Sequence, residues 1–205
     1  RIDITAYKTK GTATETVQTI IDLEYNSNGQ VGKKTVATTF NDFYGNPQTS
    51  TTYYEYSYSG NTVTETQETL SSSTIQTDPA GRIISYIPTG NMYSFSYTYS
   101  ETGNLASFSH TSGATVVNYT YGHDAKHGIF EYVRMPKWFT SLFLDGGLHL
   151  ANNVNSEAVE SGSRSTYSYE YNQHGYPAVV NITPPKDSGN ETVSRTVVSY
   201  FDITE

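Results

Sequence analysis

Two histidines and an aspartate lie close together in the segment His123-Asp-Ala-Lys-His127. On a helix, histidines four residues apart share one face and can bind a metal ion together. Here the segment follows a strand-like run and is bounded by Gly122 and Gly128, which favours a loop, and no Glu follows the first His as in metalloproteases. We therefore favour a solvated turn over a metal site at His123 and His127, and we expect no cofactor.

Carboxylates are the second candidate for chemistry, because glycoside hydrolysis needs two of them on facing strands. The glutamates on expected strands are Glu55, Glu65, Glu68, Glu157, Glu160 and Glu170. Most of them belong to the hydroxyl-rich face of their strand, where they aid solubility and protect sheet edges. No Gly-x-Ser-x-Gly sequence is present either. We expect that the chain is not an enzyme, and a glycan-active hydrolase is the third of our hypotheses.

Aromatic side chains are the third candidate, since the 205 residues include 19 Tyr. Tyr93-Ser-Phe-Ser-Tyr-Thr-Tyr99 and Tyr167-Ser-Tyr-Glu-Tyr171 alternate rings with hydroxyl or charged residues, which is typical of strands with one aromatic face. Such a face can bind sugars by stacking, or it can form the core, because aliphatic residues are few. We favour the core. The candidate ligand-binding residues are Tyr97, Tyr99, Tyr169, Tyr171 and Trp138.

The strands that carry these rings are joined by a repeated phrase. In each copy Asn, Asp or Ser precedes a Gly by three residues, and a strand former follows the Gly by two. With the three residues that precede this polar residue, the copies span residues 23–31, 75–83, 97–105 and 169–177. Asn, Asp and Ser bond their own backbone in turns, and Gly adopts positive φ. We therefore expect Gly29, Gly81, Gly103 and Gly175 in hairpin turns at positive φ.

The repeated hairpins predict a single all-β domain over residues 1–205. We expect a long antiparallel meander of about 12–15 strands, curled into a barrel-like or half-barrel sheet. The strands lack the aliphatic outer band of a transmembrane barrel. One segment has helical periodicity, with apolar residues at 135, 138, 139, 142 and 143. It predicts one short helix near 136–144 that covers an opening of the sheet.

Composition excludes several partners. The net charge is −8 and no stripe of Lys or Arg occurs, so nucleic acid and anionic membranes are poor partners. The chain has no cysteine, which excludes disulfides and cysteine nucleophiles. No apolar run reaches the length of a membrane-spanning helix. No signal peptide is visible, and because the sequence starts at Arg1 and not at Met, we expect a mature or trimmed chain from which a leader could have been removed.

Two resemblances add to these observations. Asp78-Pro-Ala-Gly-Arg-Ile83 resembles the YD-repeat of Rhs-type and teneurin-type proteins, with Thr77 in place of the usual Tyr. A longer likeness involves Tyr119–Gly128, Leu148–Val154 with its Asn152-Asn153 pair, and Tyr169–Pro177. These segments are similar to an uncharacterised family of Bacteroidetes domains that has a porin-like fold and occurs in exported lipoproteins. The likeness implies an exported protein of the periplasm or outer-membrane surface, tethered by a lipid outside this sequence.

The residues and the resemblance together leave two functional hypotheses ahead of the hydrolase. The first is a non-enzymatic exported binding or scaffold module. The second is a protein that binds a carbohydrate or another small ligand in a Tyr-lined concavity. The expected partner is a neutral glycan or another surface protein, because an acidic chain repels anionic glycans.

Overall fold

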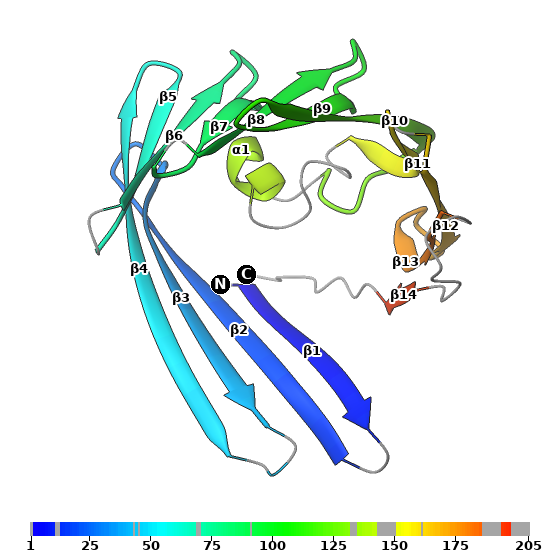
Figure 1. Cartoon of the computed structure of the whole chain (residues 1–205), viewed down its shortest axis with the longest axis horizontal. Coiled ribbons are helices and arrows are strands. Elements are labelled where there is room, and N and C mark those ends of the chain that lie inside the picture. The colour runs from blue at the N-terminus through cyan, green and yellow to red at the C-terminus, as the bar shows by residue number, and fades with distance from the viewer. Residues whose placement is uncertain are drawn as a thin grey trace. The chain divides into compact units, whose positions relative to one another are not determined.

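The computed structural model describes residues 2–10, 13–42, 44, 46–68, 71–90, 92–131, 135–142, 151–160, 162–185 and 194–197. Within them, strands that are neighbours in the chain are neighbours in the sheet and run antiparallel (Figure 1). The sheet order is β1 to β14. The all-β class and the antiparallel meander are therefore confirmed.

The strands in the first half of the chain are β1 (Ile2–Lys10), β2 (Ala13–Tyr25), β3 (Val31–Asn41), β4 (Pro47–Ser59), β5 (Thr62–Gln67), β6 (Ser71–Thr77), β7 (Ile83–Ile87) and β8 (Tyr93–Tyr99). The strands that follow are β9 (Leu105–Ser112), β10 (Thr115–His127), β11 (Asn152–Val159), β12 (Arg164–Tyr171), β13 (Pro177–Thr183) and β14 (Ser194–Val197). One helix, α1 (Lys137–Thr140), lies between β10 and β11 in the chain.

Contacts divide the chain into two compact units. Unit 1 comprises residues 1–75 and 88–90, and unit 2 comprises residues 76–87 and 91–205. Unit 1 contains the long strands β1 to β4, and unit 2 contains β7 to β14 with α1. The expected single domain over 1–205 stays a prediction.

The repeated phrase forms the same turn at each copy. Asn26 shows the pattern, because its Oδ1 accepts hydrogen bonds from the backbone N–H groups of Asn28 and Gln30, both at 3.0 Å. Asp78 and Asn172 accept the corresponding bonds, and Ser100 Oγ accepts one of them. The φ angles of Gly29, Gly81, Gly103 and Gly175 are 72°, 75°, 87° and 82°. The predicted glycine conformation is confirmed at all of these positions.

Each of these turns is connected to the core by the residue two positions after its glycine. These residues are Val31, Ile83, Leu105 and Pro177, and all are fully buried. The ladder shifts register beside three of the turns, as a β-bulge does. The phrase therefore encodes a turn, a bulge and one buried anchor.

The predicted short helix is present in the described residues of the segment 136–144. Lys137–Thr140 form one α-turn, Ser141 and Leu142 continue as a π-turn, and the predicted residues 143–144 lie outside the described chain. The Ser141 hydroxyl donates to the Lys137 carbonyl at 2.9 Å, a local bond that competes with regular helix geometry. Trp138 and Phe139 are buried, as expected. No described helix has the length and hydropathy that crossing a membrane requires.

Candidate functional site

The aromatic faces follow the predicted alternation on β12. Tyr167, Tyr169 and Tyr171 are half-buried there, while Ser168 and Glu170 are exposed. On β8, Tyr97 is buried between exposed neighbours, but Tyr93 is 42% exposed. Tyr93 is the first residue of its strand and follows the exposed Met92, so burial decreases toward this end of the strand.

The rings of β7, β8 and β9 stack on one another across the strands. Phe95 of β8 lies between Tyr86 of β7, at 5.8 Å and 12° between planes, and His110 of β9, at 4.9 Å and 17°. Phe108 also stacks on Phe95, at 5.6 Å. Because both faces of the central ring are covered, a sugar cannot stack on it. The geometry supports packing at this ladder and not a sugar platform.

Two of the predicted ligand-binding tyrosines, Tyr169 and Tyr171, use their hydroxyls for hydrogen bonds inside unit 2. The Tyr169 hydroxyl donates to the Val154 carbonyl, and the Tyr171 hydroxyl donates to Asp124 Oδ2. The Arg82 guanidinium lies over the Tyr99 ring at 4.5 Å. Among the candidates, the rings of Tyr169 and Tyr171 contact each other, with centroids 6.0 Å apart.

Trp138 is 4% exposed, and its backbone N–H donates to the Gly81 carbonyl at 3.0 Å. The backbone at the start of α1 is therefore bonded to the turn that follows β6. A ring buried to this extent presents almost no surface to a ligand.

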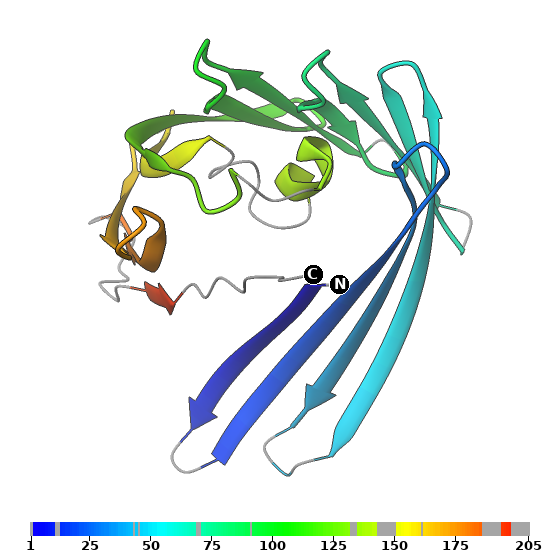
Figure 2. The same ribbon diagram turned by 180° about the vertical axis from the view of Figure 1, so that it is seen from behind.

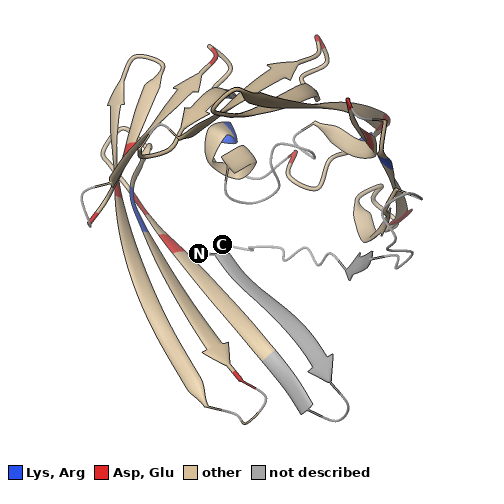
Figure 3. Cartoon of the chain, in the orientation of Figure 1, with Lys and Arg blue, Asp and Glu red and all other residues tan. Residues whose placement is uncertain are grey.

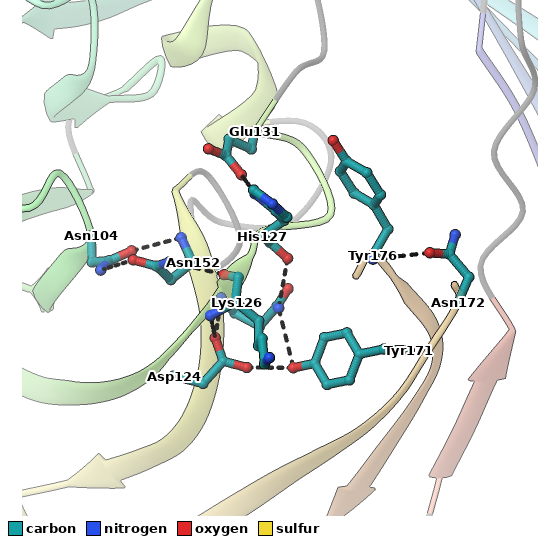
Figure 4. A network of polar contacts seen from close by, with 10 residues as sticks. Asn104, Asp124, Lys126, His127, Glu131, Asn152, Tyr171, Asn172 and Tyr176 are labelled. Atoms are coloured by element: carbon teal, nitrogen blue, oxygen red, sulfur yellow. Dashed lines mark hydrogen bonds and ion pairs between the residues drawn. The ribbon is translucent and has the colours of Figure 1, made fainter. Parts of the chain in front are cut away.

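Two asparagines join the turn before β9 to the start of β11 (Figure 4). The Asn104 amide donates to Asn152 Oδ1 at 2.9 Å, and the Asn152 backbone N–H donates to Asn104 Oδ1 at 2.9 Å. Asn152 Nδ2 also donates to the Lys126 carbonyl at 2.8 Å. This reciprocal pair fixes the two segments relative to each other.

Asp124 is the carboxylate of the same network (Figure 4). Its Oδ1 accepts bonds from the backbone N–H groups of Lys126 and Asn153, at 3.0 and 3.2 Å, and its Oδ2 accepts the Tyr171 hydroxyl. Burial, the hydrogen bond to Asp124 and the charge of Asp124 raise the pKa of Tyr171. The phenol therefore stays protonated and holds the carboxylate in place.

The two histidines have different surroundings. His127 Nδ1 lies 2.7 Å from Glu131 Oε2, and its ring stacks on Tyr176 at 5.1 Å (Figure 4). His123 lines the cleft described next. Over the described ranges, no group of three or more His, Asp or Glu side chains can hold a metal ion.

A polar cleft of about 470 Å³ adjoins the network in unit 2. Its lining residues are Ser100, Thr102, Asn104, Leu105, Ala106, Tyr121, His123, Asp124, Ala125 and Asn152. Burial, followed by the charge of Glu157, raises the pKa of Tyr121, which remains a neutral hydrogen-bond donor. Hydroxyl, amide, imidazole and carboxylate groups beside one aromatic ring can bind an uncharged, hydroxyl-bearing ligand.

This cleft was not found from the sequence, although signals for it exist. Asn104 follows the glycine of one repeated turn, and Asn152 begins the Asn pair that the family resemblance singled out. Asp124 and His123 were considered only as metal ligands. The residues come from β9, β10, β11 and the turn before β9, so only the folded chain brings them together.

Two glutamates were wrongly assigned to solubility. Glu65 is buried, and its Oε2 lies 3.0 Å from Lys34 Nζ and accepts the Tyr56 hydroxyl at 2.6 Å. Glu157 is half-buried, and burial raises its pKa. The alternation of residues along the strands assigned most glutamates to an exposed face correctly. It cannot show that a glutamate such as Glu65 is buried because a buried lysine neutralises its charge. Charged side chains are scattered over the described strands (Figure 3).

Comparison with known proteins shows the fold of the chain but does not show a family to which it belongs. No protein-family model matches the chain, and no curated protein matches it. Among solved structures, the chain is similar to a porin-like protein from Bacteroides uniformis, with a TM-score of 0.52 and 14% sequence identity. The alignment covers 94% of this chain and 92% of that chain. The expected porin-like fold is confirmed, while the YD-repeat and lipoprotein resemblances stay predictions.

Proposed function

We propose that the chain is a non-enzymatic binding module of the bacterial cell envelope, with the polar cleft of unit 2 as its binding site. The observation that carries this proposal is that hydrogen bonds within the protein fix the polar groups of the cleft. The pair Asn104–Asn152 and the Tyr171 bond to Asp124 hold its polar groups in place before any ligand arrives. Preorganised groups reduce the cost of binding.

The envelope assignment is supported by the likeness to a porin-like protein from Bacteroides and by the resemblance to exported lipoprotein domains. A lipid tether outside this sequence belongs to the same proposal. The non-enzymatic assignment is supported by Asp124, whose oxygens accept three hydrogen bonds from the protein. A carboxylate engaged in this way is a poor nucleophile or base.

The ligand that fits the cleft is a neutral glycan. Hydroxyl and amide groups match sugar hydroxyls, and the Tyr121 ring offers an apolar surface to sugar C–H groups. We expect the ligand to contact Thr102 and Tyr121 directly. The candidates Tyr169 and Tyr171 do not line the cleft; their hydroxyls bond to Val154 and Asp124. The alternative partner is another surface protein, and this alternative is favoured when no glycan binds.

Calorimetric titration with a panel of neutral oligosaccharides tests the proposal. Binding should weaken at least about tenfold in Thr102→Val and in Tyr121→Phe, which remove hydrogen-bonding hydroxyls. The matched control is Thr111→Val, because Thr111 lines a different pocket of unit 2. Absence of heat with every glycan, or equal loss in the control, contradicts the cleft as a glycan site.

A further inference from the structure

One strand of unit 1 has an unpaired edge. Strand β4 is 13 residues long, but β5 pairs only with Tyr54–Ser59. The other half, Pro47–Tyr53, pairs with β3 on one side. Within unit 1, no described strand lies along its other side (Figures 1 and 2). Residues 47–51 are exposed on both faces of the strand, as expected for a sheet edge.

This edge lacks the features that usually prevent strands from pairing between molecules. Exposed edges are commonly protected by Lys, by other charges or by Pro. From Asn46 to Tyr54 the chain has no charged residue, and its one proline, Pro47, is the first residue of the strand. Gln48–Tyr53 therefore present backbone N–H and C=O groups with no charged residue in the run itself. The nearest acidic groups lie at its two ends, where Asp42 bonds Asn46 and where Glu55 and Glu68 line a pocket with Tyr53.

The chemistry of the edge fits a second copy of the same chain. Each copy has a net charge of −8, so two copies meet with least repulsion where both are uncharged. An antiparallel strand pairs with itself around a twofold axis, which is the commonest symmetry of homodimers. In any such register, residues of the run Thr49–Thr52 oppose other Ser or Thr residues.

The sheet already contains such hydroxyl pairs. Thr39 and Thr49 face each other across β3 and β4 with their Oγ1 atoms 3.0 Å apart, and Thr19 and Thr38 do so across β2 and β3 at 3.3 Å. Cross-strand Thr pairs stabilise antiparallel sheets. Pairing of two β4 strands would repeat this contact.

We propose that two copies of the chain associate by antiparallel pairing of Gln48–Tyr53, so that the sheet continues across a twofold axis. The contact is short, so association is weak in solution and is strengthened where copies are held close together on one surface. The proposal is independent of the glycan site, which lies in unit 2.

Disulfide trapping tests the contact directly, because the chain has no cysteine. Single-cysteine variants Thr49→Cys, Ser50→Cys and Thr51→Cys are oxidised mildly, and disulfide-linked dimers are measured on a non-reducing gel. At least one of them should yield several-fold more dimer than Ser57→Cys. Ser57 is also exposed on β4, but β5 covers that part of the edge. Equal yields in all four variants overturn the proposal.

Sedimentation velocity of the cysteine-free chain gives a second readout. The dimer fraction should rise with concentration and should be lost in Ser50→Lys, which places two like charges near the twofold axis. Ser57→Lys adds the same charge on the paired half of β4 and should leave the dimer intact. A purely monomeric chain at the highest soluble concentration, or a dimer that survives Ser50→Lys, contradicts the proposed contact.

Discussion

Lys34 and Glu65 form a buried ion pair in unit 1, with Nζ 3.0 Å from Oε2. Their side chains are 3% and 7% exposed, whereas the next lysine, Lys33, lies 3.9 Å from Glu55 with side chains 57% and 74% exposed. Desolvation lowers the pKa of Lys34, and the charge of Glu65 opposes this effect. Adjacent positions of β3 therefore carry a buried and an exposed ion pair.

Replacement of Lys34 should be far more costly than replacement of Lys33. Lys34→Met leaves Glu65 as a buried charge without its partner and should lower the free energy of unfolding by about 3–5 kcal/mol. Lys33→Met removes an exposed pair and should cost less than about 1 kcal/mol. Urea unfolding of both variants measures the difference.

The double variant Lys34→Met/Glu65→Leu distinguishes the charge effect from lost packing. It should recover much of the stability, because apolar side chains replace both buried charges. Equal costs for Lys34→Met and Lys33→Met would mean that the Lys34 pair is not buried in solution.

Buried tyrosines should make the protein sensitive to alkali. Burial raises the pKa of Tyr58, Tyr97 and Tyr167 to about 12, from 10.0. Their folded pKa values exceed the unfolded value, so their contribution is fully present below pH 10 and is lost as pH rises toward 12. The melting temperature should fall across this window, and tyrosinate absorbance should appear with unfolding. Titration of all tyrosines near pH 10 without unfolding contradicts this prediction.

The repeated turns should need glycine because of its positive φ, and not because a side chain would lack room there. At Gly29, with φ of 72°, an added Cβ meets no atom within 4 Å, so Gly29→Ala introduces only backbone strain. We expect a loss of about 1 kcal/mol in unfolding free energy. Gly32, three residues later, has no positive φ and only ordinary contacts near an added Cβ, so Gly32→Ala is the control. A smaller loss at Gly29 than at Gly32 would contradict the turn geometry.

Truncation of Trp138 should test how α1 packs in unit 2. The indole is 4% exposed and contacts the Phe139 ring at 5.6 Å, so Trp138→Ala should destabilise by about 3–5 kcal/mol. Because Trp138 is the only tryptophan, its fluorescence maximum reports its surroundings. A blue-shifted maximum that moves to the red on unfolding is expected, and an emission maximum already typical of water in the native protein would contradict burial.

Local sequence signals predicted the strands and turns well because their causes are local. Gly29 and Asn26 lie in one turn, and the turn chemistry depends only on residues between them. The same bonding occurs at Asp42, whose Oδ1 accepts hydrogen bonds from the backbone N–H groups of Tyr44 and Asn46.

The polar cleft could not be predicted because its groups are distant in sequence. Asn104 and Asn152 are 48 residues apart, and only the register of the sheet places their amides together. Burial of Glu65 depends in the same way on Lys34, which lies two strands away. Alternation indicates which face a side chain occupies, but the partner that neutralises it is a property of the fold.

The strand order has a consequence for how the chain acquires its structure. Each described strand bonds to the strands before and after it in the chain, so these pairings can form as soon as two consecutive strands are available. Local pairings close short loops and have a low entropic cost, which favours rapid folding for a β protein. A chain emerging N-terminus first from a ribosome can therefore add one strand at a time, and no early strand must wait for a distant late one.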